Sequence, residues 1–463
     1  MPCGIDFGET TVRIAAWNAP RRAAAVASKL DCVAGRAEML ANLDGEHATP
    51  SVVSFLDDGS HLVGTAAASK QTKNAGRTVT SFHSLLALLG PADAARDAAV
   101  AACAALPFDV VAKAADGGSG DRDVVEVTLG EHTYDVVDVL ARLFGRVKAD
   151  AEAAMGAEAD CVAIAVPHDF SPAQRAGAFS AAHSLSLSTL HLALRLASFR
   201  HALYYSLLLP LPLSPSIISS AYAATWKAAT STTHGGFKSA TVFSAPIATA
   251  MHYGLDEPLK AKKGPAMPSL VLIVHAGGSS SDATLIESRE GKMNVRAFGG
   301  GGSGGNAADL AIVRMLAKRA GLPSFPDASG AFAAGDGEGS EPLALALRLQ
   351  LATALAPALA CCEEMRRRLS AAPQAKTSFD LQTWQAFAQF VVAAHGGAAD
   401  EAPAPPSALR NDRFSLGRAQ LTSIAALAME APSAIAAEVL LRGCALNYCV
   451  CVCVCVCVCV SVC

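Results

Sequence analysis

Residues suited to phosphate chemistry follow a short apolar run near the start of the chain, in the segment DFGETT (6–11). Gly8 lacks a Cβ, so backbone amides there can approach a phosphate group closely. Asp6, at the end of the predicted strand, can hold Mg²⁺ through the water ligands of the ion. The hydroxyls of Thr10 and Thr11 add hydrogen-bond donors. The segment therefore predicts a phosphate loop, although an ordinary hairpin turn can have the same residues.

A second loop of the same design follows another apolar run, in the segment HAGGSSSD (275–282). Its candidate phosphate-binding residues are Gly277, Gly278, Ser280 and Asp282. Two such strand-turn loops are typical of a duplicated α/β fold, the two-lobed actin-like ATPase fold with a ribonuclease-H-like unit in each half. We therefore expect segments 6–11 and 275–282 to meet across one cleft and to hold phosphates from both sides.

The elements that must position these loops are predicted by apolar periodicity. Buried strands are expected at Cys3–Gly8, Cys161–Pro167 and Leu270–Gly278, because these β-branched runs end in glycine or proline. Helices are expected at Tyr134–Gly156, Leu310–Ala320 and Leu343–Leu369. Strands that alternate with helices indicate an α/β architecture. The segments Gly291–Gly305 and Asp327–Glu341 are rich in glycine and predict loops.

Composition and charge argue against a nucleic-acid partner and indicate a reducing compartment. The chain has 463 residues, of which 52% are hydrophobic and 17% charged, and its net charge is −4. There is no basic surplus for nucleic acid, so no direct nucleic-acid partner is expected. Eight of the 14 cysteines lie between Cys444 and Cys463 and the others are scattered. With no secretory signal at the N-terminus, free thiols in a reducing compartment, the cytoplasm, are expected.

Two segments do not have the pattern of an evolved core. Residues 446–463 form a low-complexity Cys-Val tail, which a translated dinucleotide repeat would produce. We expect this tail to lack a consistent sheet partner and to bind no specific metal. Residues 183–234 are predicted to be an insertion or a retained intron. Within them Ala202–Trp226 is uncharged and long enough to span a bilayer, but three prolines interrupt it, and no membrane association is expected.

Across most of the chain, successive segments resemble the nucleotide-binding domain of the heat-shock protein 70 family. The segments that carry the resemblance are GIDFGETT, CVAIAVPHDFSPAQRAGAFSAA, SAPIATAMHYGL, LVLIVHAGGSSSDATLIE, GGSGGNAADLAIV and CEEMRRRLS. The resemblance implies that residues 1–182 form lobe I, and that 235–445 form the remaining edge of lobe I and an incomplete lobe II. Val439–Gly443 resembles the strand that enters the second adenosine loop. The match stops there, which implies a C-terminally truncated domain.

The resemblance also implies a ligand, ATP or ADP with Mg²⁺, and further contacts to it. Gly304 and Gly305 match the glycine pair that precedes a helix in the family. The helix that contains CEEMRRRLS resembles the one that packs on adenine, with candidate contacts at Glu363, Arg366, Arg367 and Ser370. Without the resemblance, a solvated basic helix face with pairs at i,i+3 and i,i+4 is the better interpretation of these four residues.

Several positions depart from the pattern of the family where hydrolysis depends on charge. His275 stands in place of the second carboxylate that orients the metal, and His83 falls at the position of the catalytic lysine. Ala245 replaces a glutamate that precedes a proline, and Glu9 adds a negative charge beside the expected phosphates. Because phosphoryl transfer depends on such groups, we expect ATP binding with little or no hydrolysis and name no catalytic residue.

Similar departures mark the Ssz-type branch, also called the heat-shock-70 protein 14 type, of the ribosome-associated complex. The segment HDF (168–170) agrees with that branch. The resemblance then implies a J-domain protein and the ribosome–nascent chain as partners, in co-translational folding. Alternatives are an active ATP-hydrolysing chaperone, a sugar or glycerol kinase of the same fold, and a non-functional truncated gene product. The absence of a recognisable sugar-binding segment argues against the kinase.

Overall fold

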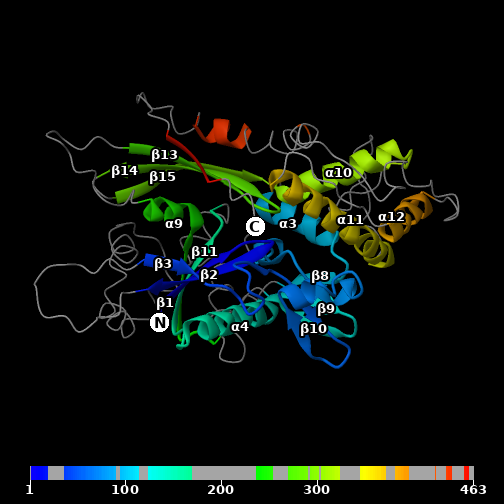
Figure 1. Cartoon of the computed structure of the whole chain (residues 1–463), viewed down its shortest axis with the longest axis horizontal. Coiled ribbons are helices and arrows are strands. Elements are labelled where there is room, and N and C mark those ends of the chain that lie inside the picture. The colour runs from blue at the N-terminus through cyan, green and yellow to red at the C-terminus, as the bar shows by residue number, and fades with distance from the viewer. Residues whose placement is uncertain are drawn as a thin grey trace, which may run out of the picture.

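The computed structural model describes most of the chain and shows two α/β lobes (Figure 1). The residues that it describes are 2–18, 36–89, 94–113, 124–168, 236–253, 269–289, 292–301, 304–323, 345–371, 381–395, 423, 434–440 and 453–457. The predicted segments 183–234 and Asp327–Glu341 lie outside these residues, as does most of the Cys-Val tail.

The first lobe is built on a sheet with the strand order β12-β11-β1-β2-β3, with β4 paired to β2. β1 pairs in parallel with β11 and antiparallel with β2, so the first predicted phosphate loop joins two neighbouring strands. The strands are β1 (Pro2–Phe7), β2 (Thr11–Asn18), β3 (Arg36–Met39), β4 (Thr49–Pro50), β11 (Cys161–Val166) and β12 (Ser239–Ser244). β1 and β11 confirm the strands predicted from the apolar runs at Cys3 and Cys161.

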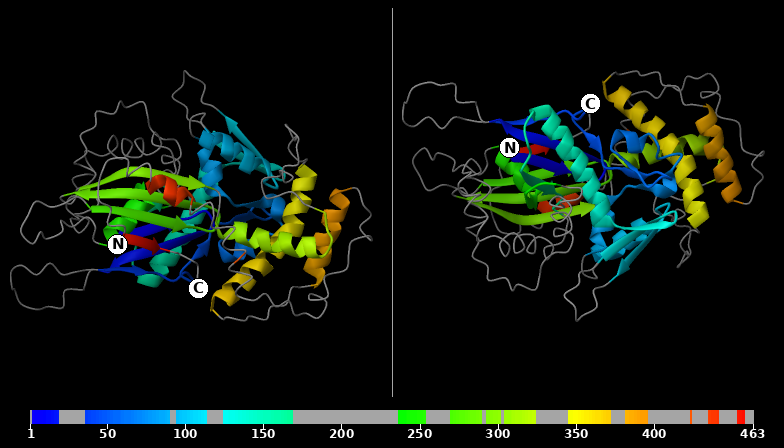
Figure 2. Two further views of the ribbon diagram at one scale, coloured as in Figure 1. Left: turned by 90° about the horizontal axis from the view of Figure 1, so that it is seen from above. Right: turned by 90° about the horizontal axis from the view of Figure 1, so that it is seen from below.

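Helix α4 (Val136–Met155) packs against this lobe (Figure 2). Asp135 caps its first turn by accepting a hydrogen bond from the Val137 amide at 2.8 Å, and Gly156 ends it in the left-handed conformation. The predicted apolar stripe is buried as expected, and its members are Val136, Val137, Leu140, Leu143, Phe144 and Val147. The Phe144 ring meets the Phe7 ring edge-on at 5.3 Å, so the helix supports the strand that leads into the first loop.

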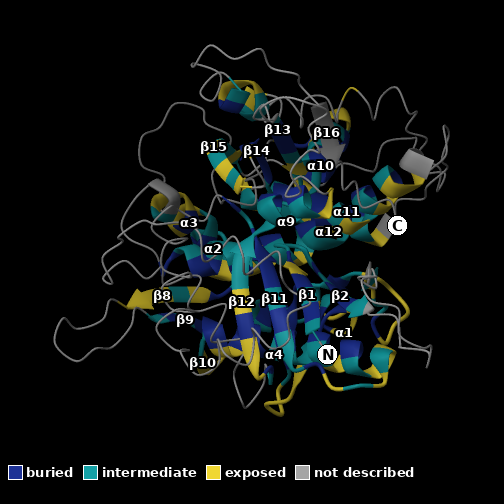
Figure 3. Cartoon of the chain, turned by 90° about the vertical axis from the view of Figure 1, so that its left-hand side faces the viewer, coloured by how far each residue is buried: buried dark blue, intermediate teal, exposed yellow. Residues whose placement is uncertain are grey.

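Among the described residues, the first lobe also has two small antiparallel sheets and three further helices. One sheet contains β5 (Val53–Phe55), β6 (His61–Val63) and β7 (Thr78–Val79). The other contains β8 (Asp109–Lys113), β9 (Val124–Leu129) and β10 (His132–Asp135). The helices are α1 (Thr65–Ala68), α2 (Phe82–Ala87) and α3 (Ala94–Ala104), with a 3₁₀ turn, η1 (Ala75–Arg77). In Figure 3 the middle strands β1 and β11 are largely buried, whereas the end of β8 is exposed.

The second lobe has a sheet in the order β15-β14-β13-β16. Its strands are β13 (Ser269–Ala276), β14 (Ser281–Arg289), β15 (Lys292–Gly301) and β16 (Cys453–Cys457). Helix α9 (Ala245–His252) packs on one face, where Ala250 meets Val271 and Ile273. Residues 434–440, which are helical, cover the other face, where Val439 meets Leu272. This double burial explains why β13 is apolar without alternation, as the sequence predicted.

Three longer helices lie beside this sheet: α10 (Gly305–Arg319), α11 (Leu345–Ala371) and α12 (Leu381–Ala394). α10 and α11 confirm the two predicted helices. By length and composition alone α11 could cross a membrane. One side of α11 nevertheless packs in a core shared with α10 and α12. Leu355 and Met365 of α11 and Phe387 of α12 are buried there.

Three sequence predictions in this lobe are wrong. Gly291–Gly305 is not a loop, because β15 occupies Lys292–Gly301. Its glycines serve close packing, since a Cβ at Gly299 would lie 3.2 Å from Val439 Cγ2. The strand predicted over Val439–Gly443 does not begin at Val439, because the Ala-rich run 434–440 is helical; residues 441–443 lie outside the described part of the chain. The Cys-Val tail does have a sheet partner, because β16 pairs in parallel with β13 over Val271–His275.

Replacing a buried and an exposed leucine by alanine should change the free energy of unfolding by very different amounts. Leu143→Ala should lower the free energy of unfolding by about 2–5 kcal/mol, because Leu143 is fully buried on α4 and truncation leaves a cavity. Leu43→Ala, the same change at an exposed side chain, should change it by less than about 0.5 kcal/mol. Urea unfolding at 25 °C measures both. Equal effects of the two substitutions would contradict the packing described here.

Candidate functional site

The first loop is a tight turn between β1 and β2. The amide of Gly8 donates to the Thr11 carbonyl at 3.1 Å, and a Cβ at Gly8 would lie only 2.6 Å from that oxygen. Ser51 fixes the turn from outside, because its hydroxyl donates to the Gly8 carbonyl and its amide to the Thr10 carbonyl, at 2.8 and 2.9 Å. Glycine is therefore required at position 8 by the turn itself, whereas the predicted approach of a phosphate to Gly8 stays a prediction.

The second loop repeats this turn between β13 and β14. The amide of Gly277 donates to the Ser280 carbonyl at 2.8 Å, and a Cβ at Gly277 would lie 2.9 Å from that oxygen. The strand registers also correspond, since Asp6 lies opposite Arg13 and His275 lies opposite Asp282. The two loops are thus equivalent parts of a duplicated fold.

The two turns touch each other, which confirms that they lie together, whereas a cleft that holds phosphates between them stays a prediction. A Cβ at Gly278 would lie 2.5 Å from Thr10 Oγ1. Gly304 packs equally closely on the second turn, because its Cβ would lie 2.7 Å from the carbonyl oxygens of both Gly277 and Gly278. The Gly305 and Asn306 amides donate to these two carbonyls at 3.0 and 2.6 Å. The start of α10 is therefore bonded to the second loop.

Each loop carries one outward side chain at the end of its first strand. Asp6 is 53% exposed, and one of its carboxylate oxygens lies 3.5 Å from Arg13 Nη1. His275 is 46% exposed, and its Nδ1 lies 3.2 Å from Asp282 Oδ2. Asp282 is only 8% exposed, and among the described residues its Oδ1 has no hydrogen-bond partner. A carboxylate is thus present in the first loop, whereas the second presents an imidazole with a buried carboxylate behind it.

His83 lies beside the first loop and is tied to it at both ring nitrogens. Its Nε2 lies 2.9 Å from the Phe7 carbonyl, and its Nδ1 lies 3.5 Å from Glu9 Oε2. The Glu9 carboxylate also accepts the His83 amide at 2.6 Å, at the start of α2, and the Ser84 hydroxyl at 3.4 Å. The Glu9 carboxylate is therefore largely buried against α2, and its effect on bound phosphates stays a prediction.

Ala245 begins α9 and has no group that could hold a water or a metal ion. The neighbouring Ser244 hydroxyl lies 2.6 Å from Nδ1 of His168, a buried residue at the end of β11. The His168 ring meets the Phe298 ring edge-on at 4.9 Å, so it joins the first lobe to β15. The polar link in this region is therefore between His168 and Ser244.

The predicted adenine-contacting residues on α11 separate into two groups. Arg367 pairs with Glu363 at 2.8 Å, and both side chains are exposed, as expected for a solvated helix face. Arg366 instead turns toward α10 and binds both oxygens of the buried Asp309, at 2.9 and 3.1 Å. These hydrogen bonds raise the pKa of Arg366 above its ordinary value. The side chain of Ser370 lies outside the described residues.

Sequence analysis missed two residues of this framework. Asp309 lies within the expected helix but had no local signal, because only the fold brings Arg366 to it. Arg348 of α11 reaches the first lobe, where it donates to the Leu106 carbonyl and to the Asp109 carboxylate, both at 2.8 Å. Arg366 also lies close to Gly305, where a Cβ would be 3.2 Å from its Nη2. Helix α11 is therefore bonded to the first lobe through Arg348 and to α10, beside the second loop, through Arg366.

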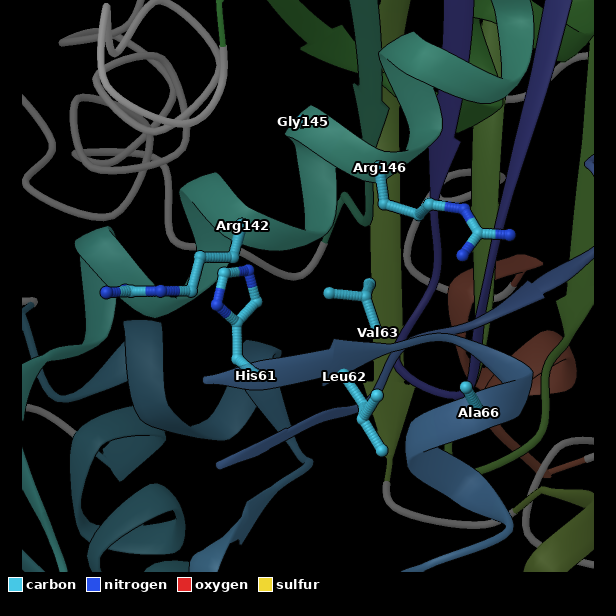
Figure 4. A pocket seen from close by; sticks show the side chains of 7 residues that line it. All are labelled: His61, Leu62, Val63, Ala66, Arg142, Gly145 and Arg146. Atoms are coloured by element: carbon cyan, nitrogen blue, oxygen red, sulfur yellow. The ribbon is translucent and has the colours of Figure 1, made fainter. Parts of the chain in front are cut away.

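A separate cavity of about 340 Å³ lies between α4 and β6. None of the predicted site residues lines it; its lining consists of His61, Leu62, Val63, Ala66, Arg142, Gly145 and Arg146. Figure 4 shows the guanidinium groups of Arg142 and Arg146 directed to opposite sides of it. Arg142 lies over the Phe55 ring, 5.1 Å from its centroid, and Arg146 pairs with Asp150 at 2.8 Å. Both cations are thus engaged in the fold.

The chain matches a protein-family model over more than half of its length. The model of the family described as Hsp70 protein matches residues 3–192 and 223–329. The matched residues include both turns, the helix α4 and the start of α10. The unmatched residues 193–222 fall within the segment 183–234, whose interpretation as an insertion stays a prediction.

Two adjacent arginines test the framework. Arg366→Ala should destabilise the protein by about 3 kcal/mol, because it leaves the Asp309 carboxylate buried without its cation. Arg367→Ala should cost less than about 0.5 kcal/mol, because the pair with Glu363 is exposed to solvent. The midpoints of urea unfolding at pH 7 compare the two. A larger loss for Arg367→Ala would show that the Arg366–Asp309 pair is not the link that holds α11 to α10.

Proposed function

Because the chain belongs to the Hsp70 protein family, we propose that it is a chaperone nucleotide-binding domain that binds ATP or ADP with little or no hydrolysis. One observation carries the proposal. The two turns keep glycine at positions 8, 277 and 278, where a Cβ would meet the facing chain, and histidine or alanine stands where the resemblance expects the charged groups of hydrolysis. Binding and turnover depend on different parts of such a site, so they can be lost separately.

Binding is assigned to the groups that the structure gathers around the two turns. The phosphate side would be formed by Gly8, Thr10, Thr11, Gly277, Gly278, Ser280, Asp282, Gly304 and Gly305. The base would lie toward α11, where Glu363, Arg366, Arg367 and Ser370 were predicted. Of these, Arg366 is best supported, because its bonds to Asp309 hold its guanidinium plane beside Gly305. A fixed guanidinium can stack on a base with little loss of side-chain entropy.

The donor set fits the expected Mg²⁺ only in part. Asp6 offers a half-exposed carboxylate, which suits a hydrated Mg²⁺. The equivalent position of the second loop offers the imidazole of His275, which Mg²⁺ does not prefer. When bound, the ion would neutralise charge on the phosphates. Asp6 would orient its water ligands from one side only.

His83 is poorly suited to the task of a lysine. A lysine supplies a mobile ammonium on a long stem, whereas the His83 ring is held by the Phe7 carbonyl and by Glu9. The carboxylate of Glu9 also offsets any positive charge on this ring. We therefore assign His83 to the support of the first loop rather than to catalysis, and Ala245 to no chemical role.

In the cell, we propose action in the cytoplasm with a J-domain protein on the ribosome–nascent chain, as in the Ssz-type branch. Family members generally work with J-domain co-chaperones. The support for the finer assignment is the loss of hydrolytic groups together with the HDF segment that begins at His168. In this interpretation the chain acts as a regulatory module, and ATP turnover is dispensable.

The catalytic part predicts a specific gain of function. The unmodified chain should bind ATP weakly and hydrolyse it near the uncatalysed rate. Joint replacement His83→Lys and His275→Asp should raise single-turnover hydrolysis by about 100-fold or more, because each group contributes transition-state charge stabilisation. Affinity for ATP should change less. Single-turnover assays with labelled ATP, beside equilibrium titrations, separate the two quantities, and robust hydrolysis by the unmodified chain would favour the active-chaperone alternative.

The partner assignment predicts co-sedimentation. The full chain should migrate with ribosomes in sucrose gradients when its J-domain partner is present, and should leave that fraction when the partner is depleted. High-salt washing should reduce the signal if the contacts are electrostatic. Migration with free protein under both conditions would remove the ribosome from the proposal without affecting nucleotide binding.

A further inference from the structure

Strand β8 forms an edge of the sheet in the order β10-β9-β8. It pairs with β9 in an antiparallel register, and among the described residues no strand lies along its other edge. All of its residues except Val110 are exposed, and Figure 3 shows β8 at the outside of the molecule. An edge strand presents N–H and C=O groups that can pair with another chain. β8 is therefore a candidate interaction surface.

The usual devices that protect an edge strand are missing from β8. Proline, a β-bulge or a very short strand each prevent pairing at an edge. The sequence DVVAK contains no proline, and each of its 5 residues has a partner in β9 without a shift of register. The charge of Lys113 is offset within the chain, because its ammonium pairs with Glu126 at 2.6 Å. The edge is consequently open to a strand of suitable sequence.

The side chains on the outer face of β8 are complementary to themselves. Because side chains alternate along a strand, Asp109, Val111 and Lys113 share one face, whereas Val110 packs on the core of the first lobe. An antiparallel copy of β8 centred on Val111 would place Asp109 opposite Lys113 of the second copy, and the same pair would recur at the other end. Such a two-fold pairing matches unlike charges twice.

Both charged side chains can take a second partner. Asp109 is 54% exposed and binds Arg348 through Oδ1, at 2.8 Å. Lys113 is 58% exposed, and its ammonium has three donors. Across the paired edges the charges would alternate along a row that consists of Arg348, Asp109, Lys113 and Glu126. A network of this kind is more stabilising than an isolated surface pair.

Exposed apolar side chains lie on β8 and on its neighbours. Val111 is 48% exposed at the centre of the strand. Val100 of α3 and Leu345 and Leu349 of α11 are exposed as well. α3 contacts β8, and α11 is bonded to Asp109 through Arg348. Large apolar side chains that gather on neighbouring elements are typical of an interaction surface.

We propose that the chain forms a two-fold homodimer in which β8 pairs antiparallel with β8 of a second copy, centred on Val111. The two copies of the sheet β10-β9-β8 would become one continuous sheet across the interface. A pairing of this length buries little area, so we expect a Kd on the order of 10 µM. The inference is independent of the proposed nucleotide binding.

Sedimentation equilibrium of the full chain, from about 1 to about 200 µM, measures this association. Val111→Lys should raise the Kd of the dimer by about tenfold or more, because two like charges then face each other across the axis. Leu43→Lys is the matched control, since Leu43 is also an exposed apolar side chain but lies in the loop that follows β3. The control should leave the Kd unchanged, and thermal unfolding of both variants checks that the fold is retained.

An exchange of charges tests the register. Lys113→Glu makes both ends of the strand acidic, and Asp109→Lys makes both ends basic, so neither variant should associate with itself. A mixture of the two variants should form heterodimers, because unlike charges face each other again. In a mixture of ¹⁵N-labelled and unlabelled unmodified chain, carbodiimide should cross-link Lys113 of one copy to Asp109 of the other. Mass spectrometry identifies this peptide by its mixed label.

Three results would overturn the proposal. The first is a chain that stays monomeric over the whole range of concentration, including one that binds an extended peptide of another protein instead. The second is a dimer that Val111→Lys leaves unchanged, since its interface would then lie elsewhere. The third is a mixture of the two charge variants that stays monomeric although both variants unfold cooperatively.

Discussion

The close approach of three backbone segments is the constraint on which the site depends. The second turn accepts hydrogen bonds from the first amides of α10 through the carbonyls of Gly277 and Gly278, and it touches the first turn at Thr10. A Cβ at Gly278 or Gly304 would lie less than 3 Å from its neighbours. The two lobes can therefore place their loops together only while these positions lack side chains.

This contact is held in place by pairs that reach outward from it. The Arg366–Asp309 pair joins α11 to α10, and the first turn of α10 is bonded to the second loop. Arg348 joins α11 to the first lobe. On the other side, α4 supports the strand of the first loop through the contact between Phe144 and Phe7. The Arg366–Asp309 pair thus supports the second loop, and the contact between Phe144 and Phe7 supports the first loop.

His83 and His275 are held in the fold in the same way. His83 lies between the Phe7 carbonyl and Glu9, and His275 lies on Asp282. Each imidazole has a carboxylate partner within its own loop region, although Oδ1 of the buried Asp282 has no hydrogen-bond partner among the described residues. The two turns therefore keep their glycine geometry, with a histidine and its carboxylate partner beside each of them.

The sequence by itself determined the α/β class, the three buried strands, the helix stripes and both glycine turns, because periodicity and steric demands are local. The resemblance carried by its motifs also singled out His83, Ala245 and His275 as departures from the pattern of the family, which stays a prediction. Only the tertiary structure decided what these side chains contact, since the partners of Arg366 and Arg348 lie 57 and 239 to 242 residues away in the chain. It also overrode local signals, because the glycines of β15 serve packing under Val439, and the Cys-Val segment pairs with β13. Packing and strand pairing between distant segments stabilise contacts that no local sequence pattern predicts.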